Sequence, residues 1–156
     1  MIDLAIPGHG KVHFEHLVCD VNGTLTIDGS LIEGIAACIT AASQSLKIHL
    51  ITADTHGRQY EIDQILGMNA IRLVPGDEAT QKADFISKLG SREVIAIGQG
   101  ANDAKMLKSA GLGICILSPE GTHVESMMAA DIIVPNIFSA FDLITKPSRM
   151  IATLRR

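Results

Sequence analysis

Residues 19–26 read CDVNGTLT, and the aspartate of this stretch, Asp20, ends the apolar run HLVCD. The pair Asn22-Gly23 is a common signal for a β-hairpin turn. Alternatively, Asp20 ends a buried strand, where its carboxylate can act as a covalent nucleophile and form an aspartyl phosphate. The neighbouring segments decide between these two interpretations.

Short runs rich in Val, Ile and Leu recur along the chain and alternate with helical patterns. The predicted strands are 16–19, 47–52, 71–74, 94–98, 112–117 and 131–134, and the predicted helices are 31–45, 56–67, 78–89, 103–110, 122–129 and 136–145. Continuous apolar runs are typical of parallel strands that are buried on both faces. We therefore predict an α/β fold, with a single doubly wound, Rossmann-like and mostly parallel sheet that carries helices on both faces.

The length of 156 residues suits one ordinary domain. We predict a single domain over residues 1–156, because no linker, repeat or low-complexity segment interrupts the pattern. Within it, residues 1–16 surround Pro7-Gly8 and are expected to form an edge hairpin. Residues 24–34 are expected to form a small flap.

Composition excludes several classes of function. The net charge is −4 and the basic residues are thinly spread, so a nucleic-acid groove is not expected. No apolar run approaches the roughly 20 residues of a membrane span, and no signal-peptide pattern is present. The three cysteines (Cys19, Cys38 and Cys115) have no regular spacing, which indicates buried, reduced thiols. We expect a cytoplasmic protein that binds neither nucleic acid nor membrane.

Polar residues follow three of the predicted strands, at the edge of the sheet where α/β proteins bind ligands. Asp20 follows the first strand, Thr52 the second, and the sequence GQGAND (98–103) the fourth. Attack by a carboxylate on phosphorus needs a divalent cation, donors for the phosphoryl oxygens and a further positive charge. Thr52 offers a hydroxyl donor, Lys82 offers the charge, and Asp103 offers a second carboxylate for Mg²⁺.

In this order the residues resemble the haloacid dehalogenase superfamily, whose first motif is D-x-D-G-T. The chain is most similar to the phosphorylation domain of P-type ATPases, and it looks like the small soluble P-type ATPase-like group of the superfamily. That domain carries D-K-T-G-T-L-T, T-G-D, a lysine and G-D-G-x-N-D. The matching segments here are DVNGTLT (20–26), TAD (52–54), Lys82 and GQGAND (98–103).

The resemblance implies a Mg²⁺-dependent phosphohydrolase, or phosphatase, that acts on a small phosphorylated metabolite through an aspartyl phosphate. The catalytic residues that it implies are Asp20, Asn22, Thr52 and Lys82. The phosphate-binding residues that it implies are Gly23, Thr24, Thr52, Ala53, Lys82 and Asn102. The metal ligands that it implies are Asp20, Asn22 through its backbone carbonyl, Gln99 and Asp103.

P-type ATPases carry their nucleotide-binding domain between the first and second motifs. Only 25 residues separate Thr26 from Thr52 here, so the resemblance implies neither an ATP-binding domain nor a large cap. Transport is not expected of the chain alone, which has no predicted membrane span. Capless relatives often complete their site by self-association, so a homo-oligomer, either a dimer or a tetramer, is expected.

Two positions depart from the family pattern. Asn22 stands where the phosphatases carry a general acid/base, whose help is typically worth about 10²–10⁴-fold in rate. Gln99 replaces an aspartate that binds Mg²⁺, and it keeps an oxygen but loses the charge. Two hypotheses therefore stay open: a slow phosphohydrolase, or a weakened domain that binds phosphate or a phosphorylated ligand, or that acts through a regulatory partner. Asp54 and His56 are candidates for a substitute acid.

Overall fold

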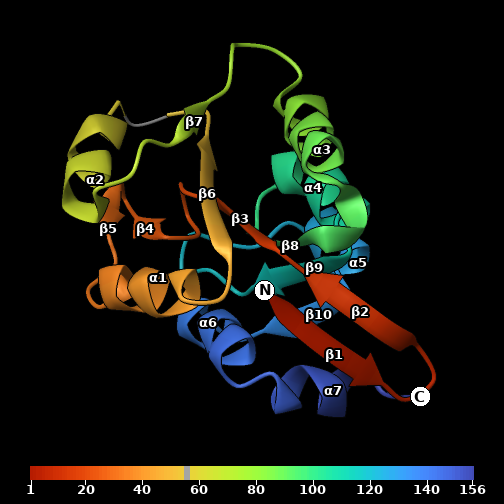
Figure 1. Ribbon diagram of the computed structural model, residues 1–156. Helices are drawn as coiled ribbons and strands as arrows, with labels where there is room; N and C mark the ends of the chain where they lie inside the picture. The colour runs from red at the N-terminus through yellow and green to blue at the C-terminus, as the bar shows by residue number, and fades with distance from the viewer. Residues whose placement is uncertain (55–56) are drawn as a thin grey trace.

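The computed structural model describes residues 1–54 and 57–156 (Figure 1). Its central sheet has six strands in the order β10-β9-β8-β3-β6-β7, and all neighbouring strands in it are parallel. These strands are β3 (His16–Asp20), β6 (Lys47–Thr52), β7 (Ile71–Arg72), β8 (Val94–Gly98), β9 (Leu112–Ile116) and β10 (Ile132–Val134). The predicted α/β fold is confirmed.

Helices cover both faces of this sheet (Figure 1). One face packs against α1 (Ile35–Ser43), α6 (Ile137–Thr145) and α7 (Ser148–Leu154), and α2 (Gln59–Leu66) adds Ile62 to the same core. The other face packs against α3 (Glu78–Leu89), α4 (Ala104–Ser109) and α5 (Val124–Ala129). The helix α7 was not predicted from the sequence. No helix of the described residues is long and apolar enough to cross a bilayer.

The strand β3 shows why the apolar runs do not alternate with polar residues. Successive side chains of a strand point to opposite faces of its sheet. Leu17 and Cys19 belong to the core under α1 and α6, whereas Val18 belongs to the core under α3 and α4. All three are fully buried, so β3 must be apolar on both faces.

Two antiparallel hairpins lie outside the central sheet. The first joins β1 (Ile2–Ile6) to β2 (Gly10–Phe14) in a separate two-stranded sheet. We expected this hairpin at an edge of the main sheet, but it forms a sheet of its own. Its strand β1 packs against α7. The second joins β4 (Thr26–Ile27) to β5 (Ser30–Leu31), within the segment expected to form a flap.

The turn of the second hairpin is Asp28-Gly29, and both residues have positive φ angles, 51° and 75°. Such angles are required by the type I′ turns that suit two-residue hairpins. This pairing also shortens the first predicted helix, because residues 30–31 are used in β5 and the helix begins at Ile35. The predicted start of the second helix, residue 56, lies outside the described residues, and α2 begins at Gln59.

Candidate active site

The carboxyl ends of three adjacent strands converge at one edge of the central sheet. Asp20 ends β3, Thr52 ends β6, and Gly98 ends β8. Since β8, β3 and β6 are neighbours in the sheet, their ends lie side by side. Lys82 reaches this edge from α3, and Asp103 reaches it from the short 3-10 helix η2 (Ala101–Asp103). The structure thus brings together residues that the sequence spreads over 84 positions.

A buried ion triad forms the centre of the site. The ammonium of Lys82 lies 2.6 Å from Oδ1 of Asp20 and 2.7 Å from Oδ1 of Asp103. Lys82 and Asp103 are 0% exposed, and Asp20 is 5% exposed. Buried charges are tolerated in proteins when they are paired in this way. Two carboxylates and one ammonium leave the triad with a net charge of −1.

The environment of the triad shifts its titration. Burial raises the pKa of Asp20 to about 6, and repulsion from Asp103 adds to this rise, although Lys82 and Thr24 oppose it. Burial alone would lower the pKa of Lys82, but attraction to the two carboxylates outweighs it and raises that pKa. Lys82 is therefore an ammonium at neutral pH, and Asp20 is a carboxylate that the folded protein stabilises poorly.

We expect Asp20→Asn to stabilise the protein in the absence of divalent metal. At pH 8 the carboxylate is ionised in the folded and in the unfolded chain, but its raised pKa means that folding disfavours the charge. One pKa unit corresponds to about 1.4 kcal/mol, so the gain in the free energy of unfolding is expected to reach about 1–3 kcal/mol. Denaturant unfolding in EDTA measures it.

The gain in the free energy of unfolding should shrink as the pH falls from 6 to 4. In this range Asp20 of the folded wild-type protein takes up a proton, so the buried charge no longer destabilises it. Asp84→Asn, at an exposed position of α3, is the matched control and should have little effect. Equal stability of wild type and Asp20→Asn at pH 8 would contradict the raised pKa.

The segment after Asp20 folds into a compact loop, and Asn22-Gly23 is not a hairpin turn. The carbonyl of Val21 accepts hydrogen bonds from the N–H groups of Thr24, Leu25 and Thr26, at 2.9–3.2 Å. The buried hydroxyl of Thr24 donates to Oδ2 of Asp20 at 2.9 Å. Thr24 of this loop and Lys82 of α3 each bond one oxygen of Asp20, and together they fix the rotamer of the candidate nucleophile.

The side chain of Asn22 points toward the end of β6. Its Nδ2 donates to Oγ1 of Thr52 at 3.3 Å, and the same Oγ1 accepts the N–H of Asp54 at 2.8 Å. Thr52 is fully buried, and Ala53, which follows it, is half-buried. The first-motif amide and the hydroxyl predicted to hold phosphate are thus direct neighbours.

The loop after β8 is organised by Asp103. Its Oδ2 accepts the N–H groups of Gln99 and Gly100, both at 2.9 Å, while its Oδ1 accepts from Lys82. Both carboxylate oxygens are therefore occupied within the protein. The contacts give Asp103 a role in holding the lysine and the loop, and its predicted role as a metal ligand stays a prediction.

Other candidates are directed elsewhere. The side-chain amide of Asn102 donates to Oε2 of Glu78 at 2.8 Å, in the first turn of α3. The carboxylate of Asp54 accepts the N–H of Gln59 at 3.1 Å, at the start of α2. His56, the other candidate for a substitute acid, lies outside the described residues.

The donor set around the first-motif loop fits a hard divalent cation. Asp20 offers a carboxylate, Asn22 offers its backbone carbonyl, and Gln99 offers a side-chain amide whose Nε2 lies 3.3 Å from that carbonyl oxygen. Rotating the amide by half a turn would direct its oxygen to the same place. Within the described residues no three His, Cys, Asp or Glu side chains gather as a metal cluster. A metal here would therefore combine the carboxylate of Asp20 with amide and backbone oxygens, which Mg²⁺ accepts.

Sequence reasoning missed a turn that follows β9. The hydroxyl of Ser118 donates to the carbonyl of Gly23 at 2.6 Å, so this turn abuts the first-motif loop. A signal was available, because Ser118 also follows a buried strand at its carboxyl end. The rule that located Asp20 and Thr52 applies equally to this position.

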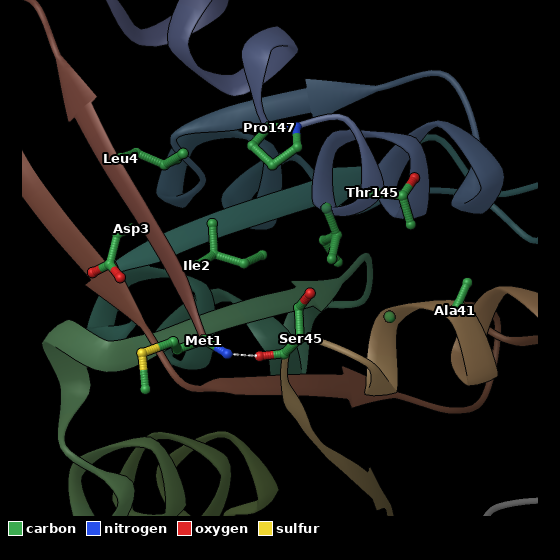
Figure 2. Close-up of a pocket in the computed structure, with 10 residues that line it drawn as sticks. Met1, Ile2, Asp3, Leu4, Ala41, Ser45, Thr145 and Pro147 are labelled. Atoms are coloured by element: carbon green, nitrogen blue, oxygen red, sulfur yellow. Dashed lines mark hydrogen bonds between the residues drawn. The ribbon is translucent and has the colours of Figure 1, made fainter.

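None of these residues lines a cavity of about 440 Å³ elsewhere in the structure (Figure 2). It is lined by β1, α1 and the end of α6, and the terminal amine of Met1 donates to the carbonyl of Ser45 beside it. A smaller apolar cavity of about 130 Å³ borders the first-motif loop at Gly23 and Thr24. Only the smaller cavity touches the candidate site.

Known proteins resemble this chain in sequence and in fold. Residues 78–123 match the family model described as haloacid dehalogenase-like hydrolase. An uncharacterised protein of Methanocaldococcus jannaschii is 37% identical over 84 residues, which are 51% of this chain and 90% of that protein. A probable copper-exporting P-type ATPase of Archaeoglobus fulgidus is 29% identical over 110 residues, 68% of this chain but only 13% of the ATPase.

Among solved structures, the 3-deoxy-D-manno-octulosonate 8-phosphate phosphatase of Moraxella catarrhalis has the same fold. The TM-score is 0.69 at 21% identity, over 92% of this chain and 94% of that one. The fold and the site together define a class of protein: an α/β domain with an aspartate–lysine–aspartate triad at the carboxyl edge of its sheet. The chain belongs to the haloacid dehalogenase superfamily, which confirms the resemblance of its sequence motifs.

Proposed function

We propose that this protein is a divalent-metal-dependent phosphohydrolase that acts on a small phosphorylated metabolite through an aspartyl phosphate on Asp20. The observation that carries the proposal is the buried triad, in which Lys82 holds Asp20 and Asp103 at the carboxyl edge of the sheet. A lysine buried between two carboxylates costs desolvation energy that a stable core does not require. Such a group is characteristic of a functional site.

The charge of the site supports the need for a metal ion. The triad carries −1, so on its own it would repel a phosphate dianion. A bound Mg²⁺ supplies positive charge that lets the carboxylate and the phosphate approach one another. Asp20, the carbonyl of Asn22 and the side-chain carbonyl of Gln99 would hold it, while Asp103 keeps Lys82 in place.

The residues then divide the reaction between them. A carboxylate oxygen of Asp20 attacks phosphorus, the phosphorus–oxygen bond to the leaving group breaks, and the leaving group departs with the bonding electrons. The hydroxyl of Thr52, the N–H of Ala53 and the ammonium of Lys82 would hold the phosphoryl oxygens. Attack of water on the aspartyl phosphate then releases inorganic phosphate and restores Asp20.

Asn22 sets the expected choice of substrate. Its amide cannot deliver a proton, so leaving groups that depart as stable anions are favoured over alkoxides. Acyl and aryl phosphates should therefore react faster than alkyl phosphates. The solved phosphatase from Moraxella catarrhalis, whose structure is a complex with magnesium ion, phosphate ion and KDO, supports a metal and a small substrate for this fold.

The test is the formation of the phosphoenzyme. Wild type and Asp20→Asn are incubated with acetyl phosphate, with Mg²⁺ or with EDTA, and quenched in acid. The gain in mass of one phosphoryl group on the peptide that contains Asp20 is expected only for wild type with Mg²⁺. Phosphate release from a panel of acyl, aryl and alkyl phosphates is measured alongside. Neither phosphoenzyme nor release above the Asp20→Asn background would contradict the proposal.

A second candidate function is a domain that binds phosphate or a phosphorylated ligand without turning it over. It is favoured by the two amides at Asn22 and Gln99, of which the first is hydrogen-bonded to Thr52. Calorimetric binding of inorganic phosphate that depends on Lys82, without phosphoenzyme, would support it. Assembly into a homo-oligomer and a cytoplasmic location stay predictions of the sequence.

A further inference from the structure

The turn after β9 carries a carboxylate, Glu120, to which the proposed reaction assigns no role. Three hydrogen bonds of 2.9 Å close this turn: Ser118 N–H to Thr122 Oγ1, Gly121 N–H to Ser118 O, and Thr122 Oγ1 to the carbonyl of Ile116. The backbone of Glu120 is therefore held in one place, and the fold fixes the position from which its side chain extends.

The same turn joins two parts of the site. Ser118 Oγ donates to the carbonyl of Gly23 at 2.6 Å and accepts the N–H of Glu120 at 3.1 Å. The Oε1 atom of Glu120 accepts the N–H of Asp28 at 3.3 Å, in the turn of the β4–β5 hairpin. Glu120 therefore stands between the first-motif loop and the hairpin that flanks it.

The other oxygen, Oε2, faces Gly23 beside the amide of Gln99. A Cβ atom on Gly23 would lie closer than 3.0 Å to both Glu120 Oε2 and Gln99 Nε2, so a glycine is required there. The φ angle of Gly23, 75°, requires a glycine as well. Since Gln99 Nε2 lies 3.3 Å from the carbonyl of Asn22, the carboxylate, the amide and the carbonyl meet around the same loop.

We propose that Glu120 supplies the charged oxygen of the divalent-metal site that Gln99 does not provide. In the donor set of Asp20, Asn22 and Gln99, charge comes from Asp20, which already pairs with Lys82. Mg²⁺ is usually bound by one or two carboxylates together with waters. Glu120 brings a second carboxylate from the turn after β9, and its exposed position lets it carry charge without a desolvation penalty.

This inference rests on the proposed function only for the place of the metal. The test is isothermal titration calorimetry of Mg²⁺ into metal-free protein without substrate. Glu120→Gln keeps the size of the side chain and an oxygen that accepts the N–H of Asp28, but it removes the negative charge. We expect Mg²⁺ to bind at least about tenfold more weakly. Glu125→Gln, an exposed glutamate at the start of α5, is the matched control and should bind like wild type.

A second substitution tests whether the charge itself matters. In the Glu120→Gln background, Gln99→Asp returns a carboxylate to the same loop, so Mg²⁺ affinity is expected to recover. Thermal unfolding in EDTA, unchanged by Glu120→Gln, shows that the turn is intact. Asp20→Asn reports on the site as a whole and should weaken binding strongly.

The outcomes separate the two proposals. Weaker binding in both Glu120→Gln and Asp20→Asn supports the role of Glu120. Weaker binding in Asp20→Asn alone overturns that role and leaves the proposed function intact. Binding unchanged in both variants, or no binding to wild type, overturns the metal site and with it both proposals.

Discussion

Asn22→Asp is expected to accelerate the breakdown of the phosphoenzyme by about 10²–10⁴-fold, the usual worth of a general acid/base. The side chain of residue 22 reaches Thr52, since Asn22 Nδ2 lies 3.3 Å from Thr52 Oγ1. A carboxylate in the same rotamer would stand beside the bound phosphoryl group, where it can take a proton from the attacking water. It can also protonate a departing alkoxide, so alkyl phosphates should gain the most.

The measurement is a single-turnover chase: phosphoenzyme is formed with acetyl phosphate, excess substrate is removed, and the loss of label from Asp20 is timed. Asn69→Asp, at an exposed position between α2 and β7, makes the same change of charge elsewhere and should leave the rate unchanged. If Asn22→Asp decays at the wild-type rate, another group already activates the water, or residue 22 does not face it.

Lys82→Met is expected to lower the free energy of unfolding by about 3–5 kcal/mol at pH 8, because it leaves two buried carboxylates without a partner. The ammonium holds Asp20 and Asp103 at 2.6 and 2.7 Å, and methionine has a similar length without the charge. The loss should become smaller at acidic pH, where the two carboxylates can take up protons. Phosphoenzyme formation should also be lost, since Lys82 is proposed to hold the phosphoryl group.

Denaturant unfolding at pH 5 and pH 8 measures this effect. Lys88→Met, at an exposed position of the same helix, is the control for the change of residue and should alter stability little. A loss in Lys82→Met that does not vary with pH would assign the destabilisation to packing and not to unpaired charge. Combining Lys82→Met with Asp103→Asn should recover part of the lost stability, because it removes one of the two unpaired buried carboxylates.

Much of this site could be predicted from sequence because it depends on strand order. Asp20 and Thr52 end buried strands, and a parallel sheet places such ends together. Lys82 carries a signal of its own: Phe85, Ile86 and Leu89 follow it at the spacing of one helix face, so the lysine lies on the apolar stripe of α3. A solvated lysine would stand on the opposite face, and Lys82 is fully buried.

The other features depend on long-range contacts that no local pattern specifies. The position of Glu120 follows from Ser118 bonding to Gly23, 95 residues away in the chain. The hydrogen bond between Asn102 and Glu78 likewise joins the 3-10 helix η2 to the first turn of α3. The pattern at residues 1–16 predicted the hairpin, but its expected place at an edge of the main sheet was wrong, because the pairing of β1 with β2 does not specify which layer the pair covers.

The central position of β3 affects how the active-site geometry can be lost. This strand is paired along both edges, with β6 on one side and β8 on the other. Amide hydrogens in such a strand exchange with solvent only when most of the domain unfolds. Those of a two-stranded hairpin such as β4–β5 exchange when the hairpin alone unfolds. The candidate nucleophile therefore belongs to the most persistent part of the fold, and the β4–β5 hairpin to a more labile part. Partial unfolding would then expose the candidate site to solvent while Asp20 and its neighbouring strands still hold their positions.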